Sequence, residues 1–125
     1  MDILKLDHFV LTVKNLQHTI DFYTKVLGMT EVHFGAGRVA LMYGQQKINL
    51  HELGNEFEPK AQNVKAGSAD LCFITTTPLA NAITHVREQG VDVLEGPVPR
   101  TGAQGTIMSF YFRDPDGNLI EISNY

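Results

Sequence analysis

The sequence predicts an α+β fold made of two tandem modules, each with the element order β-α-β-β-β. Residues 4–13 alternate as a strand does, and residues 16–27 follow with apolar side chains at helical spacing. A polar segment, residues 54–67, then separates this block from a second one in which the same order restarts. The repeated order indicates one supersecondary unit used twice.

Two shifts of the sequence align the modules. A shift of 62 residues places His8 on Asp70 and Gly28 on Gly90, whereas a shift of 72 places residues 47–51 on residues 119–123. Each module alone is too small to bury its own sheet face. We therefore expect modules at about residues 4–53 and 68–125 to form one domain, residues 1–125. Its curved, mostly antiparallel mixed sheet would surround a cleft.

The first module contains one helix between strands. Asn15 is a suitable N-cap for a helix over residues 16–27, and Gly28 is a suitable residue to end it. Three short strands are expected at residues 30–34, 39–43 and 47–52.

The second module repeats this order with a longer loop. Pro78 stands where a helix often begins, and Gly90 stands where it would end. Strands are expected at 69–75, 91–94, 106–113 and 119–123, with a Gly/Pro-rich loop at 96–105. The sequence Asp114-Pro115-Asp116-Gly117 predicts a tight turn before the last strand.

Composition excludes several classes of function. The chain has 125 residues, 43% of them hydrophobic, and a net charge of −4 without a basic stripe, which argues against nucleic acid or an anionic membrane as a partner. No apolar run approaches the length of a membrane span, and no signal peptide is recognised at the N-terminus. The single cysteine, Cys72, fits a cytoplasmic protein and is expected to be a small buried hydrophobe.

The first and last strands of the modules carry the side chains that are suited to chemistry. They are His8, Asn49, His51, Asp70, Glu121 and Ser123. Imidazole and carboxylate groups facing a common space suit a divalent metal such as Ni²⁺, Zn²⁺, Mn²⁺, Fe²⁺ or Mg²⁺. Glu121 is notable because a carboxylate in an apolar strand is costly to bury unless it is paired or bound to metal.

Three segments resemble one family. Residues 6–13 look like the opening strand, residues 21–29 the first helix, and residues 112–122 the last hairpin of glyoxalase/bleomycin-resistance/dioxygenase domains, the vicinal oxygen chelate superfamily. Within it, residues 49–52, 56–61 and 96–103 resemble the glyoxalase domain-containing protein 5 group.

The resemblance implies a metal-dependent, lyase-type enzyme that acts on a small molecule with adjacent oxygens. The substrate could be a thiol adduct of an α-oxoaldehyde. Carried over by position, the metal site would comprise His8, Asp70, Asn49 and Glu121, and Glu121 would also be the catalytic carboxylate. His51, one pleat further along the same face, could replace Asn49 as the metal ligand. Asn49 stands where glyoxalases usually place Glu, and Asp70 where they place His.

Three further side chains are assigned to the substrate, namely Asn49, Arg100 and Ser123. The alternatives are a metal-free protein that sequesters a small molecule, as bleomycin-resistance relatives do, or a dioxygenase or thiol transferase of the same superfamily. The family also implies a homodimer.

Overall fold

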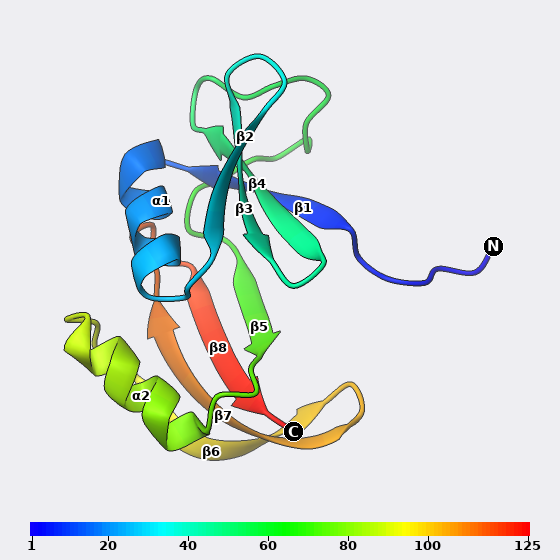
Figure 1. Cartoon of the computed structure of the whole chain (residues 1–125). Helices are drawn as coiled ribbons and strands as arrows, with labels where there is room; N and C mark the ends of the chain where they lie inside the picture. Colours follow the sequence, from blue (N-terminus) through cyan, green and yellow to red (C-terminus); the bar gives the residue numbers. More distant parts are fainter. The chain divides into compact units, whose positions relative to one another are not determined.

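The computed structural model describes residues 1–125 and divides into two compact units, Met1–Ala66 and Gly67–Tyr125 (Figure 1). Each unit has one helix and one four-stranded sheet, which confirms the predicted α+β class and the repeated β-α-β-β-β order. None of its helices has the length and apolar character needed to cross a membrane.

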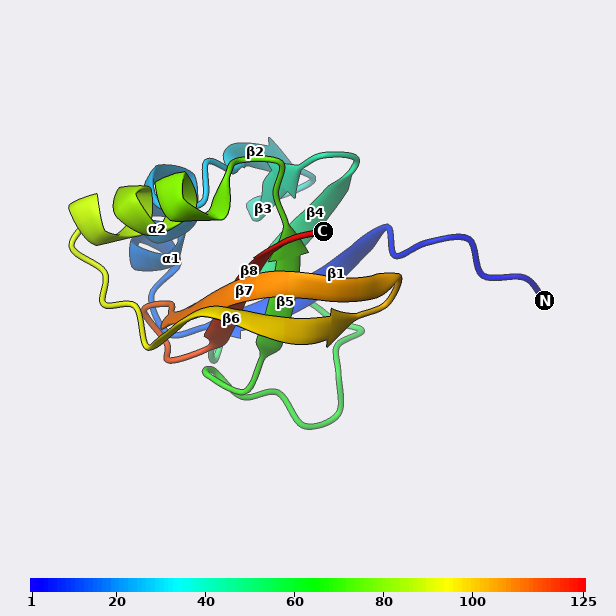
Figure 2. The ribbon, with the colours of Figure 1, turned by 90° about the horizontal axis from the view of Figure 1, so that it is seen from below.

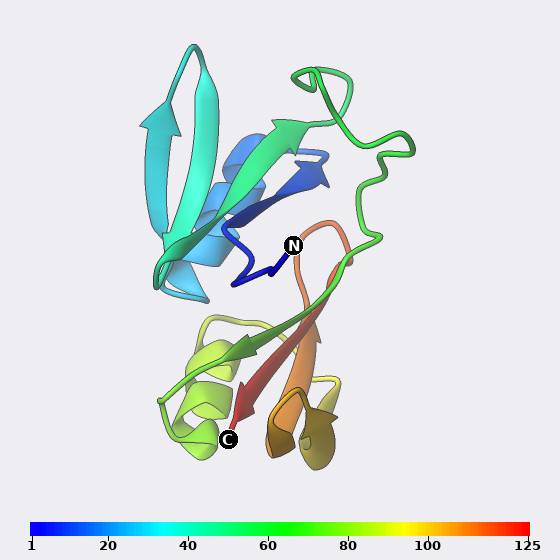
Figure 3. The ribbon, with the colours of Figure 1, turned by 90° about the vertical axis from the view of Figure 1, so that its right-hand side faces the viewer.

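The first unit contains β1 (His8–Val13), α1 (Leu16–Lys25), β2 (Thr30–Phe34), β3 (Arg38–Tyr43) and β4 (Gln46–Glu52). Its sheet has the order β1-β4-β3-β2, in which β1 and β4 are parallel and the other pairs antiparallel. After β4 the chain continues as a long loop without helix or strand until β5 begins at Asp70 (Figure 3).

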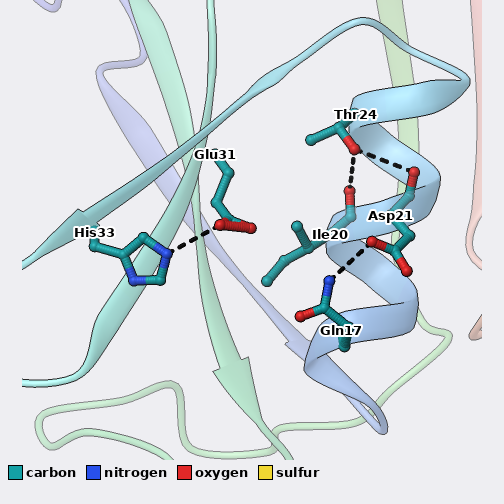
Figure 4. A network of polar contacts seen from close by, with 6 residues as sticks. All are labelled: Gln17, Ile20, Asp21, Thr24, Glu31 and His33. Carbon is teal, nitrogen blue, oxygen red and sulfur yellow. Dashed lines mark hydrogen bonds and ion pairs between the residues drawn. The ribbon is translucent and has the colours of Figure 1, made fainter.

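Helix α1 begins and ends where the sequence predicts, within two residues. The Asn15 side chain accepts a hydrogen bond from the His18 backbone N–H at 2.9 Å, and Gly28 adopts a φ of 68° just after the helix. On the exposed surface of the helix the Gln17 Nε2 donates a hydrogen bond to the Asp21 Oδ1 at 2.8 Å (Figure 4). In the same view His33, a histidine without a motif, pairs with Glu31 of its own strand.

The second unit contains β5 (Asp70–Ile74), α2 (Leu79–Glu88), β6 (Glu95–Gly102), β7 (Gly105–Arg113) and β8 (Leu119–Asn124). Its sheet has the order β5-β8-β7-β6, with β5 parallel to β8. Strands β6 and β7 form a long hairpin (Figure 2).

The pairing registers of the two units agree with the shifts found in the sequence. His8 pairs with Lys47 in the first unit, and the equivalent residues Asp70 and Leu119 pair in the second. Likewise, Val10 with Asn49 corresponds to Cys72 with Glu121. The internal repeat is therefore a repeat of hydrogen-bonded register, not only of element order.

The strand assignment between residues 91 and 105 was wrong. Residues 91–94 form no strand, and most of the predicted loop at 96–105 is strand β6, which begins at Glu95. Pro97 and Pro99 caused the error, because proline is excluded from central strands but tolerated on an edge. Strand β6 is the edge of its sheet, and its register shifts between Glu95 and Val98.

Alternation along the strands gives each sheet an apolar face and a polar face. In the first unit Leu41, Ile48 and Leu50 are buried with Ile20 and Tyr23 of α1. In the second unit the corresponding layer lies beside α2 and consists of Ile83, Val86, Phe110, Phe112, Ile120 and Ile122. The candidate functional residues lie on the opposite face of each sheet, since strand neighbours alternate sides.

Candidate functional site

In the second unit, Glu121 occupies the centre of the face opposite α2. It lies on β8 directly between Cys72 of β5 and Tyr111 of β7, which are its register partners on either side. Opposed strand residues have Cβ atoms about 4.5–5.5 Å apart, so three polar side chains meet here. Glu121 is half-buried, and no salt bridge neutralises it.

Ser123, two residues after Glu121 on β8, contacts both Glu121 and Cys72. It is fully buried, and its hydroxyl lies 3.4 Å from the Glu121 Oε1, 2.7 Å from the Ser109 Oγ and 3.4 Å from the Cys72 Sγ. The sequence assigned Ser123 to the substrate, and the structure places it in a hydrogen-bond network with Glu121 and Cys72.

A cavity of about 400 Å³ opens beside Glu121 and reaches the β6–β7 hairpin. Arg100 lines it, and its Nε donates to the Tyr111 hydroxyl at 3.0 Å while a terminal nitrogen contacts Glu95 at 3.2 Å. The guanidinium is exposed and held in place by these contacts. It can therefore present a fixed positive charge to an anionic group in the cavity.

The expectation that Cys72 is buried was wrong. The apolar run around it alternates across β5, so Leu71 and Phe73 take the helix side and Cys72 is exposed beside Glu121. Partial desolvation raises the pKa of the Cys72 thiol, and the Glu121 charge adds to the rise, against the hydrogen bond to Ser123. Desolvation and a hydrogen bond to Glu121 also raise the pKa of Tyr111.

In the first unit, His8 is exposed and oriented by its neighbour. Its Nδ1 lies 2.7 Å from the Asp7 Oδ1, and this hydrogen bond lowers the pKa of the Asp7 carboxyl. With Nδ1 engaged, the imidazole Nε2 is the nitrogen that is left for another ligand.

Two other polar side chains of the first unit are buried and lack partners. His51 is 2% exposed with neither ring nitrogen hydrogen-bonded, and Asn49 is 5% exposed with an unpartnered Oδ1. An unsatisfied buried polar group costs about 1–3 kcal/mol. Burial lowers the pKa of His51, and the nearby Arg38 charge lowers it further, so the imidazole is held neutral.

The structure separates some of the residues that the sequence grouped together. His8 pairs with Lys47 and His51 pairs with Thr12, so the two histidines lie four positions apart along β1 and β4, about 13 Å. Asp70 is exposed, one pleat before Cys72, on the same side of the sheet as Glu121. Within neither unit do three His, Cys, Asp or Glu side chains gather as a metal-holding group.

Sequence reasoning missed Tyr111 as a site residue and did not place Cys72 beside Glu121. Alternation along residues 106–113 was visible in the sequence, and it fixes which side Tyr111 takes. The partner of Tyr111 depends on the hairpin register, which no residue pattern around the turn shows.

A model of the Glyoxalase/Bleomycin resistance protein/Dioxygenase superfamily matches residues 5–122. The chain belongs to this superfamily. The match spans both units of the chain.

Three relatives extend the family assignment to whole chains. The virulence protein STM3117 of Salmonella typhimurium is 56% identical over all of this chain and 87% of its own length. The glyoxalase domain-containing protein RDO1 of Mycosarcoma maydis is 55% identical over all of this chain and 70% of its own. The integron cassette protein VCH_CASS1, from the mobile metagenome of V. cholerae, has a solved structure with a TM-score of 0.99. It is 70% identical, with 100% of this chain and 98% of that chain covered.

Proposed function

We propose that this superfamily member is a divalent-metal-dependent, glyoxalase-like enzyme acting on a small molecule with adjacent oxygens. His8 and Glu121 are the proposed metal ligands, and Glu121 is also the carboxylate that moves a proton. The observation that carries the proposal is the contact between Asp7 and His8, 2.7 Å long, because it leaves the Nε2 available.

The chemistry of these donors fits a metal. A histidine that ligates a metal through one ring nitrogen usually donates the other N–H to a carboxylate, which fixes its tautomer and raises its basicity. The Asp7–His8 pair has this form. Glu121 is a half-buried carboxylate without a salt bridge. A divalent cation would compensate its charge, because a buried carboxylate is costly unless it is paired or bound to a metal.

The remaining proposed ligand is Asp70, which shares the Glu121 side of its sheet. A bound divalent metal would supply Lewis-acid polarisation of the substrate oxygens. We do not include His51 in this proposed metal centre, because its register position is four residues from that of His8.

The chain's own residues supply the proton transfer and the orientation. Glu121 has a carboxylate beside a cavity, where it can take a proton from one carbon and return it to the next. The Ser123 hydroxyl lies 3.4 Å from this carboxylate and helps to orient it, and Tyr111 stands beside it as its register partner on β7. Arg100 lies on the same cavity and would hold an anionic end of the substrate.

The test is metal content per chain in protein purified without an affinity tag. Wild type is expected to carry close to one divalent ion per site, with the ion lost in His8→Ala and in Glu121→Ala. His18→Ala is the matched control, because His18 is an exposed histidine on α1. Retention of the ion in both ligand variants would refute the ligand assignment.

The competing function is a metal-free module that sequesters a small molecule. The unpartnered imidazole of His51 beside an apolar cavity favours it, since such a pocket binds without a metal. A wild type that neither carries metal nor takes up Ni²⁺, Mn²⁺, Fe²⁺ or Zn²⁺, yet binds small molecules, would support this function instead. A homodimer is proposed in either case.

A further inference from the structure

A second cavity, of about 370 Å³, lies in the first unit between the sheet and the loop that follows β4. It is lined by Val10, Thr12, His51, Pro59, Lys60, Ala61 and Val64. This volume is at the lower end of the range for small-molecule sites. Its walls are mostly apolar, and the groups able to recognise a polar ligand are the imidazole of His51, the hydroxyl of its register partner Thr12 and the ammonium of Lys60.

His51 is fixed in this wall by its neighbours. Its ring makes an edge-to-face contact with Phe57 at a centroid distance of 5.5 Å, and the Arg38 guanidinium lies over the Phe57 ring, 4.9 Å from its centroid. The loop therefore holds the imidazole in place without offering it a hydrogen bond. A buried ring with both nitrogens unpartnered within the chain can hydrogen-bond to a molecule that enters the cavity.

The chemistry of the two groups narrows the class of ligand. A neutral imidazole has one donor nitrogen and one acceptor nitrogen, and a hydroxyl can pair with either of them, whichever tautomer is present. Lys60 adds a positive charge, which favours a carboxylate. Its ammonium is currently 3.2 Å from Glu58, so a ligand carboxylate would compete with an exposed side chain that is 72% accessible. Such surface pairs are weak and exchange readily.

We propose that this cavity is a binding site for a small branched carboxylic acid that bears a hydroxyl group. The hydroxyl pairs with His51, the carboxylate with Lys60, and the branched carbon skeleton contacts Val10, Pro59 and Val64. The site uses none of the three residues proposed for the metal centre, His8, Asp70 and Glu121, and does not depend on the metal-dependent function. It gives a ligand class to the competing sequestering function, which rests on the same cavity.

The experiment compares 3-hydroxy-3-methylbutyrate with 3,3-dimethylbutyrate, which differ only by a hydroxyl in place of a methyl group. Binding to the full chain is followed by amide chemical shifts, with and without a chelator. We expect the hydroxy acid to bind about tenfold more tightly in both conditions, since a hydrogen bond to a buried group is worth about this factor. The shifts should centre on residues 51 and 59–64. Equal affinities, or shifts elsewhere, would overturn the proposal.

Three variants assign the contacts. His51→Phe keeps an aromatic ring against Phe57 and should abolish the preference for the hydroxy acid, so that the two acids bind with about equal affinity. Glu58→Gln removes the ion-pair partner of Lys60 and should increase the affinity for both acids severalfold. The affinity for the uncharged amide of the hydroxy acid should not change. His18→Gln is the control and should change neither. If His51→Phe does not fold, the test rests on the effect of Glu58→Gln on the affinities for the hydroxy acid and for its amide. An equal effect on both affinities would show that Lys60 does not bind the carboxylate. Binding that survives in Glu121→Ala separates this site from the metal centre.

Discussion

Cys72 and Glu121 lie directly opposite each other on the parallel strands β5 and β8, on the face of the sheet away from α2. The Ser123 hydroxyl contacts both side chains, at 3.4 Å in each case. The thiol thus lies next to the carboxylate that is proposed to transfer a proton. The reactivity of the thiol therefore depends on the charge of that carboxylate.

Neutralising Glu121 should make Cys72 more reactive. The carboxylate contributes to the raised thiol pKa, so Glu121→Gln should lower that pKa and increase the thiolate fraction. We expect iodoacetamide to alkylate the variant severalfold faster than wild type at pH 8. Ser123→Ala should act in the opposite direction, because the Ser123 hydrogen bond lowers the pKa. Equal rates in all three proteins would show that the pair is not electrostatically coupled.

Asp7→Asn should weaken metal binding although Asp7 is not a ligand. The carboxylate accepts from the His8 Nδ1, and loss of such a partner typically costs about 10–100-fold in metal affinity. Competition with a chromogenic chelator measures the change. Asp2→Asn, which alters an exposed carboxylate near the same end of the chain, is the matched control. Identical affinities in Asp7→Asn and wild type would remove the argument for His8 as a ligand.

Stability should fall in acid because of His51. Burial lowers its pKa in the folded state, so the unfolded chain binds more protons than the folded chain below about pH 6.5, the usual histidine value. The free energy of unfolding should therefore decrease as pH falls from about 6.5 to the folded-state pKa and then level off.

The check is denaturant unfolding between pH 7.5 and 5 in wild type and His51→Phe. The variant should lose less stability over this range, by about 1.4 kcal/mol for each unit of pKa difference removed. His18→Gln controls for the loss of an exposed imidazole. Parallel curves for wild type and His51→Phe would contradict the assignment of a neutral buried ring.

Asp114→Ala should destabilise the second unit by about 2–4 kcal/mol, since several hydrogen bonds end on one buried carboxylate. Its Oδ1 accepts from the backbone N–H groups of Asp116 and Asn118, both at 2.9 Å, and its Oδ2 accepts from the Asn118 side chain at 2.7 Å. Asp114→Asn keeps part of this network and should cost less. Thermal unfolding gives the comparison, and midpoints equal to that of wild type in both variants would show that the turn does not need the carboxylate.

Much of the fold followed from local signals. Asn15, Gly28 and Gly90 mark helix ends through cap and φ requirements that neighbouring residues cannot override. Strand β6 did not follow, because two prolines mask a strand whose hydrogen bonds are all made to one partner, β7. An edge position is a property of the assembled sheet, and no local pattern encodes it.

The candidate site was predictable in composition but less so in arrangement. Strand alternation predicted that Asn49 and His51 share one face of their sheet and that Glu121 and Ser123 share one face of theirs, as observed. Exposure of Cys72 was missed because an apolar run does not reveal which of its members faces the helix. That His51 lacks a partner depends on what the following loop offers it, and the loop has no periodic signal.

Most of the extra residues of the second unit lie in one place. Ala40 pairs with Asn49 as Tyr111 pairs with Glu121, so β3 and β7 are already offset by 71 residues, whereas the helix ends at Gly28 and Gly90 are offset by 62. The additional length therefore lies in β6 and its hairpin, which carries Arg100 at the cavity. The longer hairpin therefore changes the cavity wall, whereas the parallel pairing of β5 with β8, which positions Glu121, keeps the register of β1 with β4. The wall of the cavity and the position of its carboxylate are set by separate parts of the sheet.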